Sequence, residues 1–116
     1  MTDENESAIH VLKTIEPFWS AVTSGRKTFE VRKMDRPYAV GDFLILGQFP
    51  RKFQIPCVFR VTYILTHDDF PVGVAPGYCV MGMRQLEPLE FQLSRPRLIE
   101  AVQQINQWEA TNVRGL

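Results

Sequence analysis

The sequence is poor in the two residue types that most often build disulfides and metal sites. Its 116 residues include two cysteines and two histidines. Cys57 and Cys79 each lie inside an apolar, strand-like run, which is typical of reduced thiols in a protein core. His10 and His67 do not have the spacing of metal ligands, so we expect no metal and no cofactor.

Long apolar runs and net charge are missing as well. No run approaches the roughly 20 apolar residues that a membrane-spanning helix needs, and the acidic, polar start of the chain is unlike a secretory signal. A formal net charge of zero at first argues against a nucleic-acid ligand. These absences predict a cytoplasmic chain with no membrane partner. Its length suits one domain that has its own core.

The charges are nevertheless distributed unevenly. Residues 25–62 hold eight lysines and arginines against three acidic residues, whereas residues 1–24 and 63–116 are both net acidic. Such clustering creates a positive surface that a neutral total conceals. Charge alone leaves two interpretations open: a basic binding surface, or a solvated mixture of signs.

Periodicity and turn residues predict a mixed α+β chain. We expect strands over residues 9–14, 27–33, 43–46, 57–66 and 78–84. A short helix lies between Pro17, which suits a first helical turn, and Gly25, which suits the position just past a helix end. Its apolar face consists of Phe18, Ala21 and Val22. This order of elements predicts a small mixed β-barrel capped by a helix.

A second, amphipathic helix follows the strands. Ser94 is a suitable N-cap, and Leu98, Val102 and Ile105 recur at spacings of four and three. We expect this helix to pack on the barrel and to turn Gln103, Gln104 and Gln107 outward; a dimer contact is the alternative. The predicted organisation is a flexible tail over residues 1–8, a barrel domain over 9–86 and a helical extension over 87–116.

The densest group of charged residues lies in the second predicted strand. Alternation there buries Phe29 and Val31 and gathers Thr28, Glu30 and Arg32 on the other face. A lysine and an arginine beside one carboxylate can bind an anion or a base edge while the carboxylate holds the cations in place. The alternative is an exposed strand face with ordinary ion pairs, each contributing about 0–1 kcal/mol.

Two motifs occur in order along this part of the chain. The first is Gly25-x-Lys27-x-x-Glu30-x-Arg32, behind the short helix, and the second is Val40-Gly41-Asp42-x-Leu44-x-Leu46. Together they resemble the signature of the ASCH family in the PUA-like superfamily. Residues 60–64 and 77–82 are similar to the closing strands of small stand-alone ASCH-like proteins of bacteria and phages. The resemblance covers roughly residues 9–84 and implies a PUA-like mixed β-barrel with a cleft beside the helix.

ASCH domains are generally proposed to bind RNA or modified nucleosides. The resemblance therefore implies an RNA, nucleoside or nucleotide ligand in a basic cleft lined by Lys27, Glu30 and Arg32. We expect Lys33, Arg36 and Arg60 to be further cations that hold phosphate. Tyr38 and Tyr78 are the rings expected to stack on a base. Gly41 and Asp42 match a tight turn of the family and are expected to serve the fold.

Two other functions remain open. One ASCH branch hydrolyses the acetyl amide of N4-acetylcytidine with a lysine that activates a threonine. This chain keeps Lys27 but has Glu30 where that branch has its threonine, so the candidate catalytic residues are Lys27 and Glu30, with Thr28 as a further candidate. A ribonuclease would use Lys27, Arg32 and Tyr38 to stabilise charge. The second alternative is a protein-interaction module that uses the C-terminal helix.

Overall fold

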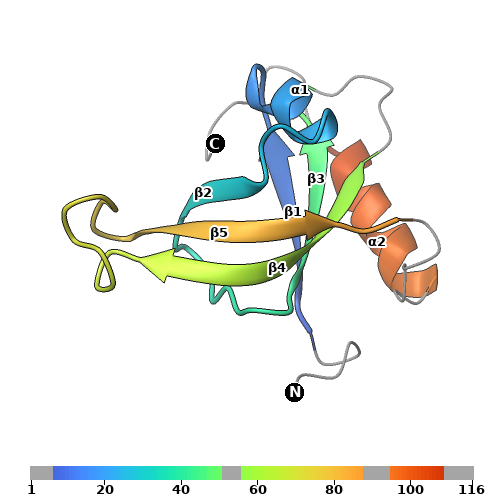
Figure 1. The fold of residues 1–116 in the computed structure, drawn as a ribbon. Coiled ribbons are helices and arrows are strands. Elements are labelled where there is room, and N and C mark those ends of the chain that lie inside the picture. The colour runs from blue at the N-terminus through green and yellow to red at the C-terminus, as the bar shows by residue number, and fades with distance from the viewer. Residues whose placement is uncertain (1–6, 51–55, 88–94, 109–116) are drawn as a thin grey trace.

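The computed structural model describes residues 7–50, 56–87 and 95–108, which form one curled sheet with two helices. In chain order the elements are β1 Ile9–Thr14, α1 Phe18–Thr23, β2 Phe29–Lys33, β3 Phe43–Gln48, β4 Cys57–Thr66, β5 Tyr78–Gln85 and α2 Arg95–Asn106 (Figure 1). The strand order is β1-β3-β4-β5-β2. β1 and β3 are parallel, and the other neighbours are antiparallel. The predicted small α+β fold is confirmed.

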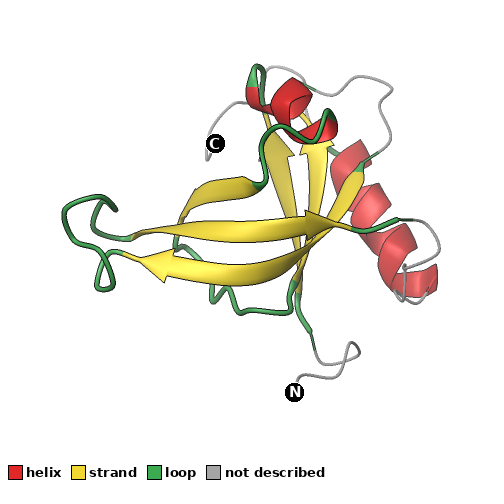
Figure 2. Cartoon of the chain, viewed as in Figure 1, coloured by secondary structure: helices red, strands yellow, loops and turns green. Residues whose placement is uncertain are grey.

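The sheet forms a half-barrel. Figures 1 and 2 show that β4 and β5 run at a steep angle to β1 and β3. Helix α1 lies at one end of the sheet, and α2 lies beside β1 and β3. The register between β4 and β5 shifts between Val61 and Tyr63, and an irregularity of this kind bends a strand and increases its twist. The edge strands β1 and β2 are not ladder partners. We call the unpaired boundary between these two edge strands the seam.

Strand β3 is buried along its whole length because both of its faces are covered. Leu44 and Leu46 belong to the core on the concave side of the sheet. Phe43 and Ile45 belong to a second core, in which they pack with Ile105 of α2. A strand covered on both faces is rich in apolar residues, which explains the apolar run at residues 43–46. The predicted packing of the C-terminal helix on the sheet is therefore confirmed.

Helix α1 is anchored in the concave core by Trp19 and Val22. Phe18 is 48% exposed, so the prediction that it shares a buried face with Ala21 and Val22 is wrong. The helix is turned so that the larger indole, which removes more apolar surface from water, takes the inner position. Gly25 follows the helix with a φ of 80°, in the left-handed region that glycine adopts without strain.

The alternation in β2 is the reverse of the one predicted. Glu30 is 3% exposed, whereas Phe29 and Val31 are 44% and 53% exposed. The prediction that Phe29 and Val31 are buried is wrong, because the concave face of β2 borders the seam, where a carboxylate can be paired with cations. The alternation correctly placed Glu30 and Arg32 on one face of the strand. This face is the inner face of the sheet and not the exposed one. Thr28 lies before the strand and is exposed.

Some predicted features fall at the limits of the described residues. Of the predicted tail, residues 1–6 lie outside the described part. Ser7 and Ala8 are bonded to the domain: the Ser7 carbonyl accepts a hydrogen bond from Arg97, and the Ala8 N–H donates one to Asp42. The Ser94 cap also lies outside. Within the described segments, neither helix has the length and apolar character needed to span a membrane.

Asp42 joins the start of β1 to the turn before β3. Its buried carboxylate accepts hydrogen bonds from His10 Nε2 at 2.8 Å and from the N–H groups of Ala39 at 2.9 Å and Ala8 at 3.2 Å. Gly41 makes the turn with a φ of 93°, a conformation that disfavours any residue with a Cβ. These contacts give Gly41 and Asp42 the role in the fold that we expected.

Replacing Asp42 with alanine is expected to lower the free energy of unfolding by about 2–4 kcal/mol, because the buried His10 ring and two part-buried backbone N–H groups lose their acceptor. Urea denaturation followed by circular dichroism measures this loss. The control is Asp68→Ala in the exposed loop after β4, which should change stability by less than about 0.5 kcal/mol. Equal effects of the two substitutions would contradict a structural role for the Asp42 carboxylate.

Candidate functional site

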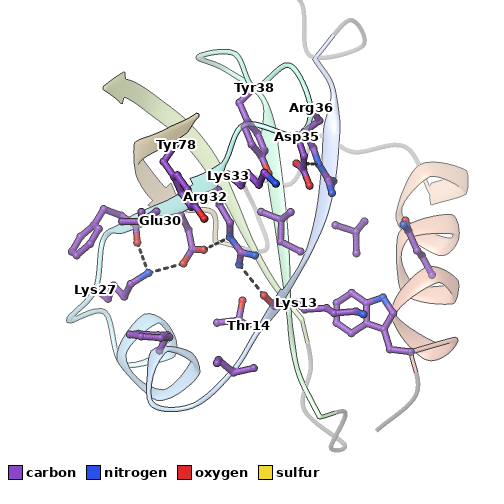
Figure 3. Close-up of a pocket in the computed structure, with 18 residues that line it drawn as sticks. Lys13, Thr14, Lys27, Glu30, Arg32, Lys33, Asp35, Arg36, Tyr38 and Tyr78 are labelled. Atoms are coloured by element: carbon purple, nitrogen blue, oxygen red, sulfur yellow. Dashed lines mark hydrogen bonds and ion pairs between the residues drawn. The ribbon is translucent and has the colours of Figure 1, made fainter. Parts of the chain in front are cut away.

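A pocket of about 980 Å³ opens at the seam between β1 and β2 (Figure 3). We call it the seam pocket. Its charged and aromatic lining residues are Lys13, Phe18, Lys27, Phe29, Glu30, Arg32, Lys33, Asp35, Arg36, Tyr38, Tyr78 and Trp108. This lining combines five cations with two carboxylates, and the volume suits a small organic ligand. The pocket exists because the sheet does not close into a full barrel.

A buried carboxylate organises the floor of this pocket. Glu30 Oε1 accepts a hydrogen bond from Lys27 Nζ at 2.7 Å, and Glu30 Oε2 accepts one from Arg32 Nε at 2.8 Å. The side chain of Glu30 is 4% exposed, and those of Lys27 and Arg32 are each 15% exposed. Charge-assisted bonds of this length are strong, and water screens them little here. We call these three residues the Glu30 cluster. Alternation predicted that Glu30 and Arg32 share a face, and the ASCH resemblance implied that Lys27 lies beside them.

The Glu30 cluster also bridges the seam. Arg32 Nη2 on β2 donates a hydrogen bond to the carbonyl oxygen of Lys13 on β1 at 2.8 Å. Lys27 Nζ donates a second bond, to the carbonyl oxygen of Phe29 at 2.6 Å. Glu30 therefore orients an arginine that ties the two edge strands together, and the floor of the seam pocket is held in place by both strands.

Predicted residues also form a wall of the pocket at the end of β2 and in the segment that follows it. Lys33 and Arg36 are exposed there, and the Arg36 guanidinium lies 3.3 Å from an Asp35 carboxylate oxygen. Tyr38 is 8% exposed, and burial raises the pKa of its hydroxyl, while Arg36 and Arg32 act in the opposite direction. Its phenol is therefore neutral near pH 7 and contributes chiefly to the core. Tyr78 is 41% exposed at the pocket and offers a ring face to a ligand.

Sequence reasoning missed the wall that β1 builds with α2 and the residues just after α2. Lys13 Nζ lies 4.7 Å from the ring centroid of Phe49 and 5.7 Å from that of Trp108. A Cβ on Gly47 would lie 2.9 Å from the Trp108 ring, so the glycine lets the indole approach the sheet. Gln104, which we expected to face outward, is exposed but lines the pocket. No local signal in the sequence marks this wall, because Trp108 lies past the end of α2 and approaches Lys13, which is far away along the chain.

Two predicted residues are not brought to the seam pocket. Arg60 lies on β4 opposite Phe43, and its guanidinium carbon is 5.0 Å from the centroid of that ring. Phe43 belongs to the core under α2, away from the concave face. Thr28 is exposed before β2 and does not line the pocket, although its carbonyl accepts a hydrogen bond from the Met83 N–H. The candidate site therefore centres on Lys27, Glu30 and Arg32.

Cysteine and metal chemistry receive no support from the described residues. These contain no group of three or more His, Cys, Asp or Glu side chains placed to hold a metal ion. Cys57 is half-buried and Cys79 is buried, and both are free thiols. Burial raises the pKa of each thiol, so neither is activated as a thiolate near neutral pH.

The chain belongs to a family described as a domain of unknown function (DUF3850), whose model matches residues 9–83. The match begins at β1, includes the whole Glu30 cluster and ends within β5. Helix α2 lies beyond it, so the wall with Gln104 and Trp108 is built by a segment outside the family match. No curated protein matches the chain.

Replacing Glu30 with alanine is expected to lower the free energy of unfolding by about 2–4 kcal/mol, because Lys27 and Arg32 would keep their largely desolvated charges without a carboxylate to balance them. Urea denaturation at fixed salt measures the change. The matched control is Asp35→Ala, which removes a carboxylate from an exposed ion pair and should change stability by at most about 1 kcal/mol. A loss no larger for Glu30 than for Asp35 would refute the organising role of Glu30.

Proposed function

We propose that this DUF3850 member is a binding module that holds RNA or a nucleotide in the seam pocket. The observation that supports this most is the charge of the lining. Five of the chain's thirteen lysines and arginines line one pocket, against only Glu30 and Asp35, in a chain whose net charge is zero. Phosphate groups supply most of the affinity in protein–nucleic acid contacts and are attracted to such a concentration of cations.

The cations of the pocket form two groups that differ in their exposure to solvent and therefore in how they can act on a ligand. Lys27 and Arg32 are fixed by Glu30 in the floor, where low exposure strengthens their field and fixed geometry gives orientation. Lys33 and Arg36 are exposed at the wall, where they attract an anion from a distance in a salt-dependent way. A pocket that has both exposed and mostly buried cations can attract a phosphate-bearing ligand and then orient it.

Exposed aromatic rings beside the floor supply surfaces for bases. Phe18 and Phe29 are 48% and 44% exposed, and Lys27 Nζ lies 5.8 Å and 5.0 Å from their ring centroids. Tyr78 presents a third exposed ring. Stacking of a base on an aromatic side chain contributes about 1–3 kcal/mol and depends little on sequence. Aromatic surface next to cations is the combination that single-stranded RNA or a nucleotide requires.

We further propose that DUF3850 is a branch of the ASCH-like, PUA-like domains. Support comes from the half-barrel with a helix between its first two strands. It also comes from the motif Gly25-x-Lys27-x-x-Glu30-x-Arg32, whose three charged residues form the Glu30 cluster. An RNA or nucleotide ligand is consistent with the cytoplasmic location that we expect.

The geometry favours binding over hydrolysis. Both oxygens of Glu30 already accept charge-assisted bonds, which suits a residue that positions cations better than a general base that must reach a substrate proton. Thr28, the candidate nucleophile, does not line the pocket. Amidohydrolase and ribonuclease activities therefore rank below binding. A protein-interaction role for α2 ranks lower too, because its Ala101 and Ile105 are covered by the sheet.

Binding of a fluorescein-labelled single-stranded RNA, measured by anisotropy at several salt concentrations, tests the proposed function. For the wild type, we expect log Kd to rise linearly with log salt. Lys33→Ala should weaken binding about three- to tenfold and reduce the slope by about 0.7, the value for one phosphate contact on a single strand. Lys33 is exposed, so this substitution should leave the fold intact.

The matched control is Arg26→Ala. Arg26 is exposed, donates a hydrogen bond to Ser24 and lies outside the pocket lining. Removing this charge should change neither the affinity nor the slope. Absence of RNA binding by the wild type, or equal losses in the two variants, would refute the seam pocket as a nucleic-acid site.

A further inference from the structure

Thr14 is a buried polar residue of the seam pocket to which the sequence motifs assign no role. It ends β1, is 3% exposed and lines the pocket. Its hydroxyl oxygen has no hydrogen-bond partner in the part of the chain that the structure describes. Figure 3 shows the Thr14 side chain pointing toward the Glu30–Arg32 pair. Leaving a buried hydroxyl unbonded costs about 1–3 kcal/mol, so a ligand that bonds it would gain from the contact.

Lys27 and Arg32 also retain hydrogen-bond donors at this place. Two of the three ammonium hydrogens of Lys27 bond Glu30 and the Phe29 carbonyl. Arg32 uses Nε for Glu30 and Nη2 for the Lys13 carbonyl, and its Nη1 bonds nothing among residues 7–50, 56–87 and 95–108. The floor therefore combines an unpartnered hydroxyl with spare N–H groups of an ammonium and a guanidinium, all suited to oxygen acceptors.

The charge of this floor limits the anion that it can neutralise. Lys27 and Arg32 contribute two positive charges and Glu30 one negative charge, so the Glu30 cluster has a net charge of one. With side chains at most 15% exposed, an unbalanced charge is costly. A singly charged oxyanion would balance the Glu30 cluster itself, whereas a dianion would need a further cation from outside the cluster, and a neutral group would leave the positive charge uncompensated.

We propose that Thr14, Lys27 and Arg32 form a subsite for one singly charged oxyanion. In the RNA ligand of the proposed function, on which this inference rests, that group is an internucleotide phosphodiester. The pocket of about 980 Å³ is far larger than one phosphate group, and further cations lie beyond the cluster at Lys13 and Lys33. The subsite thus holds one linkage of a chain, and these outer lysines lie where flanking phosphates would be attracted.

The substitution Thr14→Val tests the hydroxyl, because valine keeps the shape of the side chain and removes its oxygen. The probe is the dinucleoside monophosphate UpU, titrated calorimetrically into the full chain. We expect Thr14→Val to weaken UpU binding about tenfold, the equivalent of one hydrogen bond of about 1.4 kcal/mol. The control Thr14→Ser, which keeps the hydroxyl, should bind within about threefold of wild type.

Thermal unfolding of the unliganded variants separates a ligand contact from a structural role. Since the hydroxyl bonds no described protein group, the Tm of Thr14→Val should equal or exceed that of wild type. A loss of affinity with an unchanged or raised Tm supports the subsite. Wild-type affinity for UpU in Thr14→Val, or parallel losses of affinity and Tm, would overturn it.

The charge of the bound group is tested with uridine, uridine 5′-monophosphate and the methyl ester of that monophosphate, which are neutral, dianionic and singly charged. The methyl ester should bind more tightly than uridine and at least as tightly as the dianion. Equal binding of uridine and the ester, or a tenfold preference for the dianion, would refute a phosphodiester subsite. Should RNA bind in a Lys33-dependent way while Thr14→Val has no effect, the subsite alone fails; should no RNA bind, the proposed function fails with it.

Discussion

The bond between Arg32 and the Lys13 carbonyl, held by the Glu30 carboxylate, is the interaction on which this architecture depends. The curled sheet ends in two edge strands that do not pair, and an unpaired edge exposes backbone donors and acceptors. Arg32 satisfies one of these acceptors from the opposite edge. Its orientation depends on Glu30, and Glu30 in turn is stable in the interior only because Lys27 and Arg32 balance its charge. The Glu30 cluster therefore joins the two edge strands and also places charged groups in the floor of the seam pocket.

The open seam accounts for the presence of a pocket in so small a domain. A closed barrel of this size would fill its interior with side chains. Here the concave core of Leu44, Leu46 and their neighbours ends at the seam, and charged side chains occupy the remaining space. Because a cluster of fixed charges forms the floor and exposed cations form the wall, the same pocket can both orient and attract an anionic ligand. The segment just after α2 completes the opposite side of the pocket through Trp108, which packs over Gly47.

Prediction from sequence succeeded where a signal was local. The strand limits at residues 9–14 and 57–66 agree with β1 and β4, since alternation and β-branched residues are read within one strand. The three members of the Glu30 cluster were found because they lie within six residues of each other. Prediction failed for the direction of β2, since parity defines two faces without deciding which one is inside. It also failed for the wall with Lys13 and Trp108, which are 95 residues apart in the sequence.

Residue type and short-range spacing account for the strands and helices, for the position of Glu30 and Arg32 on one strand face, and for the concentration of cations in residues 25–62. Long-range folding was needed to place Glu30 inside, to bring Thr14 and Lys13 from β1 to the Glu30 cluster, and to put Arg60 elsewhere. Those outcomes depend on how the sheet curls and which edges face each other. They are set by long-range packing, in which β1 pairs with β3 and β2 pairs with β5.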